Sequence, residues 1–301
     1  MLNMIRYIII TFVMILSCSC QTDVQKEELE LKNQLIGITG DHYSRQLGGY
    51  QIGNKNIKND LLLRTAAISG LTEADSIMLA DKYKVQRIYD FRGKNEAMTS
   101  PDVIPGNAGY LSLSISFDVS ENVSEKKQSQ EEMIMMLLQN ADNPLVQDMC
   151  DHMYDKIFFE ESSMEVYRRF FEDLASIDPD NGAVLWHCTS GKDRTGVTAA
   201  LLLLALGASW ETVLEDYLQT NIQTQQQREA LCQGMADRNV APELIEEIRT
   251  IESVDPVYLE TCRHLIEEKY GSMDQFFVQA LGLTEEKRIR LQRKYTCQAT
   301  L

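Results

Sequence analysis

Ten residues decide the fold of this chain: His187-Cys188-Thr189-Ser190-Gly191-Lys192-Asp193-Arg194-Thr195-Gly196. The apolar run 183–186 precedes them, and the helix-forming run 197–206 follows. This order predicts a buried strand, a tight loop and the first turn of a helix. Such a loop directs several backbone N–H groups and the positive end of a helix dipole at one point. A phosphate group bound there lies against the Cys188 sulfur.

The Cys-to-Arg spacing alone is weak evidence, because the chain contains it twice. Cys232 and Arg238 have the same separation as Cys188 and Arg194, but they lie in a polar, helix-like stretch. No apolar strand and no histidine precede that second pair. We therefore interpret Cys232 as a helical surface cysteine. Only the residues around Cys188 supply the strand, loop and helix that a phosphate site requires.

Short apolar runs alternate with helical patterns along the first two thirds of the chain. Strands are predicted at 61–63, 85–89, 111–115 and 183–186. A helix is predicted after the capping box Thr72-Glu73-Ala74-Asp75, and the third of the chain after 197 looks almost wholly helical. This order predicts the α/β class, with a mainly parallel central sheet flanked by helices. Asp90, Arg92 and Cys188 then follow strand ends, where sites in such sheets lie.

Residues 131–171 are rich in methionine and aromatic residues and predict a helical insertion in the domain. Two interpretations are open. In the first, these helices pack against the sheet as ordinary core elements. In the second, they form a mobile lid, since adaptable methionine surfaces suit a segment that opens and closes.

The N-terminus has the pattern of an export signal. Arg6 precedes the apolar stretch 7–16, which is shorter than the roughly 20 residues that span a bilayer. Ile15-Leu16-Ser17-Cys18 resembles the cleavage box of bacterial lipoproteins, so we expect Cys18 to carry the lipid of an exported, periplasmic, outer-membrane or cell-surface protein. An ordinary cleaved signal or an uncleaved anchor is the alternative. The predicted organisation is a signal peptide at 1–17, a polar tether at 18–33 and one domain at 34–301.

The composition narrows the range of partners and cofactors. The 301 residues carry a formal charge of −16, which disfavours nucleic acid as a partner. The four histidines are scattered, and no Cys/His cluster has metal-ligand spacing, so we expect no metal and no cofactor. Export to an oxidising compartment predicts that a thiolate at Cys188 is sensitive to peroxide.

Residues 187–196 resemble the active-site loop of the protein tyrosine phosphatase superfamily, the cysteine-dependent phosphatases. The Lys192-Asp193-Arg194 version resembles the branch of secreted bacterial tyrosine and lipid phosphatases. Three further segments are similar to that branch: Arg45-Gln46-Leu47-Gly48-Gly49 to Arg-Asp-Leu-Gly-Gly, Leu63-Arg64-Thr65-Ala66 to Phe-Arg-Ser-Gly, and Ile88-Tyr89-Asp90-Phe91-Arg92, with Glu96 and Pro101, to its Ile-Asp-Leu-Arg element. The chain departs from the pattern at Gln46, Thr65 and Ala66. The similarity covers most of 35–295 and implies a tyrosine-phosphatase-like fold.

The residue types in the loop indicate their roles. Cys188 is the predicted nucleophile, because the backbone N–H groups, the helix N-terminus and Arg194 all favour its thiolate. Attack of the thiolate on phosphorus forms a phosphocysteine intermediate. Arg194 presents a planar fork for two phosphoryl oxygens, and Thr195 is expected to donate to the sulfur as the intermediate breaks down. The predicted substrate-binding residues are Thr189, Ser190, Gly191, Lys192, Arg194 and Thr195.

A proton for the leaving oxygen must come from a positioned carboxyl group. The resemblance implies Asp193, and Asp118 on a separate loop is the alternative. Lys192 adds a second fixed charge, which suits a phosphoinositide or a substrate with several phosphates; a solvated loop lysine is the bland interpretation.

Two residues are predicted to support the loop, His187 and Asp90. The His187 ring is expected to form a hydrogen bond with the loop backbone and so to fix the surroundings of the thiolate. Asp90 or Glu96 is expected to pair with Lys192 when the site is empty.

The sequence thus predicts a phosphoric monoester hydrolase that acts on phosphotyrosine proteins, phosphoinositides or both. One alternative is an inositol-polyphosphate phosphatase with similar loop chemistry. The other is a phosphate-binding lipoprotein without turnover, against which the intact cysteine argues, because binding alone needs no thiol.

Overall fold

A five-stranded sheet in the order β1-β4-β7-β5-β6 carries the loop 187–196. In the computed structural model, which describes residues 35–39, 44–115 and 152–299, β1 is antiparallel to β4 and the other neighbours are parallel. The strands are β1 (Arg45–Gln46), β4 (Leu62–Thr65), β5 (Arg87–Asp90), β6 (Gly109–Ser112) and β7 (Val184–His187). The mainly parallel sheet predicted from the sequence is therefore confirmed. The predicted signal peptide, Cys18, the tether 18–33, Asp118 and residues 131–151 lie outside the described residues.

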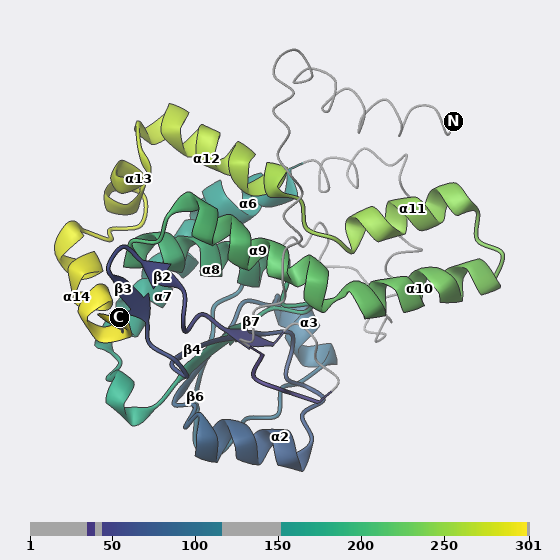
Figure 1. Ribbon diagram of the computed structural model, residues 1–301, viewed down its shortest axis with the longest axis horizontal. Helices are drawn as coiled ribbons and strands as arrows, with labels where there is room; N and C mark the ends of the chain where they lie inside the picture. Colours follow the sequence, from purple (N-terminus) through teal and green to yellow (C-terminus); the bar gives the residue numbers. More distant parts are fainter. Residues whose placement is uncertain (1–34, 40–43, 116–151, 300–301) are drawn as a thin grey trace. The chain divides into compact units, whose positions relative to one another are not determined.

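Helices cover both faces of this sheet (Figure 1). The helix α2 (Glu73–Ile77) continues as a π-helical turn, Met78–Lys82, on one face, and α7 (Glu161–Ser176) and α8 (Asp193–Leu206) cover the other. Successive strand side chains alternate accordingly: Leu62, Tyr89, Val184 and Trp186 belong to the larger apolar cluster, and Leu63, Ile88 and Leu185 to the smaller one. Because both faces are covered, the central strands are continuous apolar runs in the sequence.

The described part of the predicted insertion consists of α6 (Met153–Phe159) and the first part of α7. Both helices pack into the larger cluster, to which α6 contributes Tyr154, Ile157 and Phe158. On α7 the cluster includes Phe170 and Phe171, which stack edge-on at 5.3 Å between ring centroids. These helices therefore pack as core elements against the sheet.

The chain after the loop is almost wholly helical, as predicted. Its helices after α8 are α9 (Trp210–Gln223), α10 (Gln225–Asp237), α11 (Pro242–Ile251), α12 (Pro256–Tyr270), α13 (Met273–Gln279) and α14 (Glu285–Tyr295). The chain then adds β8 (Thr296–Gln298) to a small antiparallel sheet with β2 (Gln51–Ile52) and β3 (Lys55–Ile57). A short 3₁₀ turn, Pro179–Asn181, leads into β7.

Cys232 lies on α10, as the helical pattern predicts, but it is not a surface residue. Its exposure is 3%, and it packs with Met235 and Ile248 in a small apolar cluster. The prediction of a surface position was wrong because α10 and α11 lie side by side and bury their facing sides against each other (Figure 1).

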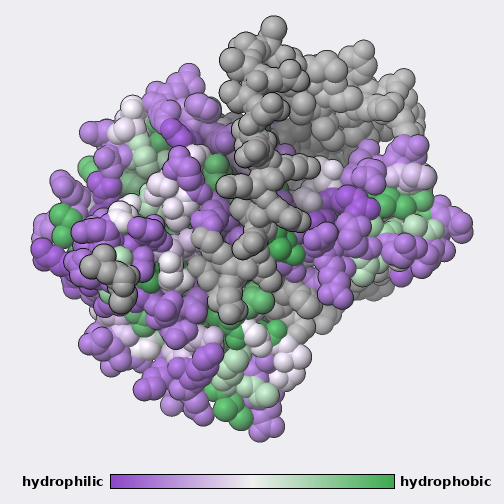
Figure 2. Space-filling view, in the orientation of Figure 1, coloured by the Kyte–Doolittle hydropathy of each residue, from purple (hydrophilic) through white to green (hydrophobic). Residues whose placement is uncertain are grey.

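The face of the molecule in Figure 2 is mainly hydrophilic, with small scattered apolar spots among the described residues. This surface agrees with the formal charge of −16. Within the described ranges, no helix has the length and apolar character needed to cross a membrane.

Candidate active site

The loop 188–192 joins the carboxyl end of β7 to the first turn of α8, as the sequence predicts. The Cys188 side chain is nearly excluded from water, at 3% exposure. Neighbouring strand ends hold the loop entry: the Phe91 N–H donates to the His187 carbonyl at 2.9 Å, and the Ala67 N–H donates to the Thr189 carbonyl at 3.0 Å. The thiol therefore stands beyond the ends of the parallel strands, where the sheet topology places a site.

Gly191 makes the tight turn of the loop possible. Its φ of +67° is unfavourable for residues with a side chain, and a Cβ atom at this position would lie 2.6 Å from the Thr65 carbonyl oxygen. The Gly196 N–H donates to the Lys192 carbonyl at 2.9 Å, so helical bonding begins within the loop. In an α-helix the first N–H groups have no acceptor within the helix itself, so a helix N-terminus is a favourable position for an anion.

Arg194 is paired with Glu96, a residue of α3 (Lys94–Thr99). Its Nη1 lies 2.7 Å from Oε2 and its Nη2 lies 2.7 Å from Oε1, a two-point ion pair. Nη1 also donates to the carbonyl of Ile115 at 3.1 Å, and the Glu96 carboxylate accepts from the N–H of Gly93 at 2.7 Å. The guanidinium is thus fixed at the base of the loop.

The charges of this pair stabilise each other. Burial disfavours both ions, but hydrogen bonds from Arg194 lower the pKa of Glu96. The same hydrogen bonds and the charge of Cys188 raise the pKa of Arg194 above its ordinary value. The prediction that Glu96 or Asp90 pairs with Lys192 was wrong. Because β5 lies directly beside β7, the helix α3 that follows β5 brings Glu96 to Arg194.

Lys192 is not a solvated loop lysine. The residue is 8% exposed, and its Nζ donates to the carbonyl of Ile251, the last residue of α11. The same Nζ lies 3.8 Å from Asp193 Oδ2. The ammonium group therefore links the loop to the carboxyl end of a distant helix.

Asp193, the first residue of α8, has a partner that the sequence did not indicate. The Tyr154 hydroxyl donates to its Oδ1 at 2.7 Å, while 24% of the Asp193 side chain stays exposed. Burial and the Asp193 charge raise the pKa of Tyr154 well above its ordinary value, so the phenol remains a donor. The carboxyl group is thus oriented and accessible, as a proton donor must be.

The remaining predicted binding residues occupy three different environments. Thr189 is exposed, and its hydroxyl donates to Glu96. Ser190 is half-buried. Thr195 is fully buried, and its hydroxyl has no hydrogen-bond partner among the described residues, the Cys188 sulfur included. Donation from Thr195 to the sulfur stays a prediction.

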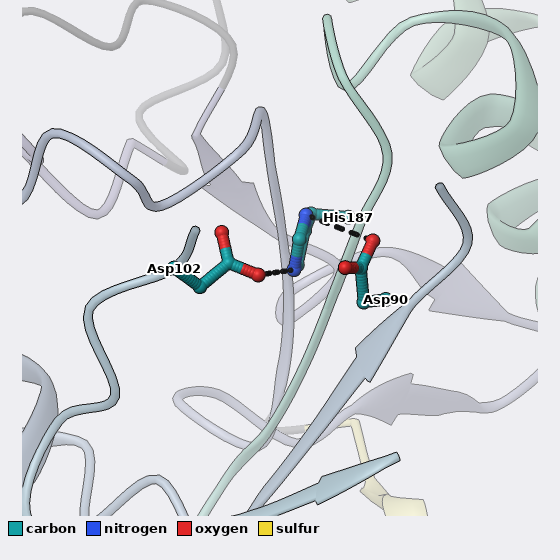
Figure 3. Close-up of side chains that lie close together, drawn as sticks. All are labelled: Asp90, Asp102 and His187. Atoms are coloured by element: carbon teal, nitrogen blue, oxygen red, sulfur yellow. Dashed lines mark ion pairs between the residues drawn. The ribbon is translucent and has the colours of Figure 1, made fainter. Parts of the chain in front are cut away.

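His187 forms the predicted hydrogen bond with the loop backbone. Its Nδ1 lies 3.0 Å from the carbonyl oxygen of Cys188, which only accepts, so Nδ1 donates. The ring is fully buried between two carboxylates (Figure 3), with Nδ1 3.8 Å from Asp90 Oδ1 and Nε2 3.2 Å from Asp102 Oδ2. Asp90 therefore supports the site through His187, and Asp102 completes the arrangement.

Asp90, Asp102 and His187 are also the described residues whose geometry suits a metal ion. A side-chain cation already lies between the carboxylates, because Arg92 Nη2 is 2.9 Å from Asp90 Oδ2 and 2.5 Å from Asp102 Oδ2. Burial works against the Asp90 charge, yet hydrogen bonds from Arg92 lower its pKa. The group is an ion-pair network behind the thiol, and the predicted lack of a metal stays a prediction.

Sequence reasoning missed Asp102 and Tyr154. Asp102 follows Pro101 in a segment that resembles the family, so a signal for it existed. Tyr154 lies 39 residues before Asp193, in a stretch without a recognisable motif.

Comparisons with known proteins agree with this geometry. A family model described as "Tyrosine phosphatase family" matches residues 37–297. The triple specificity protein phosphatase PtpB of Mycobacterium tuberculosis is 36% identical over 98 residues, 30% of this chain and 36% of the relative. A tyrosine-protein phosphatase of Nostoc commune is 29% identical over 161 residues, 54% of this chain and 48% of the relative. A Cupriavidus necator protein, provisionally named a tyrosine-protein phosphatase, is 33% identical over 115 residues, 38% of this chain and 41% of the relative.

These matches span less than half the length of each relative. The family model covers most of the chain and includes the strand, loop and helix that hold Cys188 and Arg194. The chain therefore belongs to the tyrosine phosphatase family.

Proposed function

We propose that this protein hydrolyses phosphoric monoesters through a phosphocysteine intermediate on Cys188, with phosphotyrosine in proteins as its first substrate class. The observation that carries the proposal is the buried Cys188 thiol at the end of β7. Its charge is one of the causes that raise the pKa of Arg194, so the two groups of the loop interact. Binding alone requires no thiol, which argues against a phosphate-binding protein without turnover.

The chemistry follows from the arrangement of the loop. The Cys188 thiolate attacks phosphorus, the bond from phosphorus to the ester oxygen breaks, and the leaving oxygen takes the proton of the Asp193 carboxylic acid. The planar guanidinium of Arg194, whose two Nη atoms donate to Glu96 in this structure, holds equatorial oxygens of the phosphoryl group. Water then attacks the phosphocysteine, Asp193 takes the proton from that water, and phosphate leaves with the thiolate restored.

Turnover of tyrosine-phosphorylated peptides by the purified chain tests this proposal. We expect the wild type to release phosphate and Cys188→Ser to release none. Arg194→Lys should lose roughly a hundredfold or more in kcat/KM, because a point charge cannot replace the planar fork. Equal phosphate release by the wild type and Cys188→Ser would contradict the proposal.

The choice of general acid has its own test. The hydrogen bond from Tyr154 supports Asp193. We expect Asp193→Asn to lose activity and Asp118→Asn to keep a normal pH optimum. The reverse pattern would transfer the role to Asp118.

Phosphoinositides are a second substrate class, supported by the position of Lys192 in the loop. Its ammonium group is bonded to the Ile251 carbonyl, so a second phosphate must compete for it. We expect Lys192→Ala to reduce phosphoinositide hydrolysis more than hydrolysis of p-nitrophenyl phosphate. An equal reduction of both activities would show that Lys192 has no specific role in recognising the lipid headgroup. Inositol polyphosphates belong in the same panel, since a polyphosphate specialist would prefer them.

We further propose that the protein belongs to the secreted branch of its family and is anchored by a lipid on Cys18. The support is the segment Ile15-Leu16-Ser17-Cys18 after a short apolar stretch. In bacteria fed a clickable palmitate analogue, the wild type should be labelled and recovered with membranes, and Cys18→Ala should not be labelled. Labelling of the Cys18→Ala variant would disprove the anchor site.

A further inference from the structure

Two arginines and one aspartate form a buried cluster beneath the loop, and none of them takes part in the steps above. Arg45 comes from β1, Arg64 from β4 and Asp216 from α9. Arg45 Nε lies 2.9 Å from Asp216 Oδ1, with side-chain exposures of 0% and 2%. Arg64 Nη1 lies 2.6 Å from Asp216 Oδ2, and Arg64 is 0% exposed. Both arginines belong to segments that resemble the family.

The fully buried groups of this cluster carry an excess positive charge. Two guanidinium ions share one carboxylate. They also donate to neutral oxygens: Gln223 Oε1, the Asp216 carbonyl, Thr220 Oγ1 and the Gly191 carbonyl. The Tyr50 hydroxyl, 3.4 Å from Asp216 Oδ1, stays neutral because burial raises its pKa. Glu215, the neighbouring carboxylate on α9, is only half-buried.

This excess charge is unfavourable. Burial, together with the charge of Arg45, lowers the pKa of Arg64 to about 10, against the opposing effect of Asp216. An anion nearby relieves that repulsion, because charges interact strongly where water is excluded. The phosphate loop is the neighbouring part of the structure that would bind such an anion.

Arg64 joins the cluster directly to the loop. Its Nη2 donates to the Gly191 carbonyl at 2.9 Å. The C=O and N–H groups of a trans peptide point in opposite directions, so the Lys192 N–H points away from Arg64. A Cβ atom on Gly196 would lie 3.6 Å from Arg64 Nη2, which shows that the first turn of α8 packs against the same guanidinium.

We propose that Arg64, held by Asp216 beside Arg45, is a positioning residue for phosphate binding. It fixes the peptide between Gly191 and Lys192 so that the N–H faces the bound phosphate, and it places a buried positive charge beneath the dianion without touching it. The inference rests on the proposed phosphatase function.

The test measures binding of inorganic phosphate by calorimetry to the full chain in a Cys188→Ser background, which separates binding from turnover. Arg64→Met should weaken the Kd for phosphate by roughly tenfold or more, the effect of a lost hydrogen bond to a charged group. Arg64→Lys should recover part of that loss, because it retains the charge. Arg168→Met, which removes an α7 arginine paired with Glu161 and Glu165, should leave the Kd unchanged.

Asp216→Asn distinguishes positioning from a general loss of stability. It removes the negative charge but keeps an oxygen that accepts from Arg64, so it should lower the Tm while weakening phosphate binding by less than threefold. The inference is overturned if Arg64→Met binds phosphate like the wild type, or if affinity follows Tm across all variants. Should Arg64→Met not fold, Arg64→Lys and Asp216→Asn decide the same question.

Failure of the proposed function would look different. A wild-type chain that releases no phosphate from any ester, yet binds phosphate in a way that depends on Arg64, would refute turnover and leave the positioning role intact. If the wild type turns over substrate while the Arg64 variants bind phosphate normally, the phosphatase function stands and the positioning role of Arg64 is refuted.

Discussion

The pair formed by Arg194 and Glu96 holds the guanidinium in one orientation before a substrate arrives. Two parallel hydrogen bonds at 2.7 Å are the geometry that carboxylate and guanidinium prefer. A flexible arginine would lose rotamer freedom at each binding event, whereas this one has already lost it on folding. Glu96 thus prepares Arg194 for a phosphate although the carboxylate itself repels that anion.

Glu96→Gln tests this role. The amide cannot accept at both Nη atoms, so we expect kcat/KM for p-nitrophenyl phosphate to fall roughly tenfold. Steady-state kinetics and the Tm measure the effect. The matched control is Glu161→Gln, which breaks an exposed pair with Arg168 on α7 and should change nothing. A Glu96→Gln enzyme with wild-type kcat/KM would show that Arg194 needs no such support.

Tyr154→Phe tests the orientation of the general acid. Loss of the hydroxyl at 2.7 Å from Asp193 Oδ1 leaves the carboxyl group free to rotate. Substrates with poor leaving groups need the proton most. The fall in kcat should therefore be roughly tenfold larger for an alkyl phosphate than for p-nitrophenyl phosphate. Equal losses for both substrates would point to misfolding or substrate binding instead.

The elements around the loop are connected through their ends. Cys188 follows β7, Glu96 lies on α3 after β5, and α8 begins with Asp193 and Arg194. The carboxyl end of α11 completes the set, because Lys192 donates to its last carbonyl, that of Ile251. A cation at the negative end of a helix dipole is favourable. Lys192 therefore connects the loop directly to the hairpin of α10 and α11.

Lys192→Met should loosen this connection. The aliphatic replacement keeps the stem but cannot donate, so we expect a loss of about 1 kcal/mol, concentrated at the end of α11. Amide hydrogen exchange measured by mass spectrometry should rise in 245–254 and stay unchanged in the central strands. Unchanged exchange in 245–254 would mean that the apolar contacts of α10 and α11 hold the hairpin without the lysine.

The molecule as a whole depends on buried carboxylates that are ionised. Burial raises the pKa of Asp216, but the charges of Arg45 and Arg64 lower it by more, and hydrogen bonds from Arg92 do the same for Asp90. The folded values thus lie below the unfolded value of about 3.9. Their stabilisation is complete above that pH and is lost as the pH falls through the folded values.

Acid titration of stability checks this sign. The unfolding free energy can be measured by urea titration at each pH. Asp216 and Asp90 should contribute a constant amount to it between about pH 5 and about pH 7, because both pH values lie above the unfolded pKa. The free energy should fall below a pH of about 4. Asp216→Asn should be less stable at neutral pH and lose less on acidification. A variant whose stability falls as steeply as that of the wild type would exclude Asp216 as a source of the acid dependence.

Short stretches of sequence determined the strand, loop and helix around Cys188, because their signals lie within a few residues. The turn at Gly191 and the capping box at Thr72 are local in the same sense, and both are present. The α/β class followed from the order of such segments. The loop residues Cys188, Asp193 and Arg194 could therefore be identified before any tertiary contact was known.

Partners far apart in the chain depended on which strands became neighbours in the folded sheet. Glu96 and Arg194 are 98 residues apart in the sequence, and Arg45 and Asp216 are 171 residues apart. No sequence pattern specifies a contact between residues with such separations. Burial of Cys232 likewise required α11 to pack on α10. These pairings arise from packing and charge neutralisation in the assembled core. The sequence by itself therefore determined which loop residues carry the chemistry. Only the tertiary fold determined which distant groups hold the charges of the loop in place.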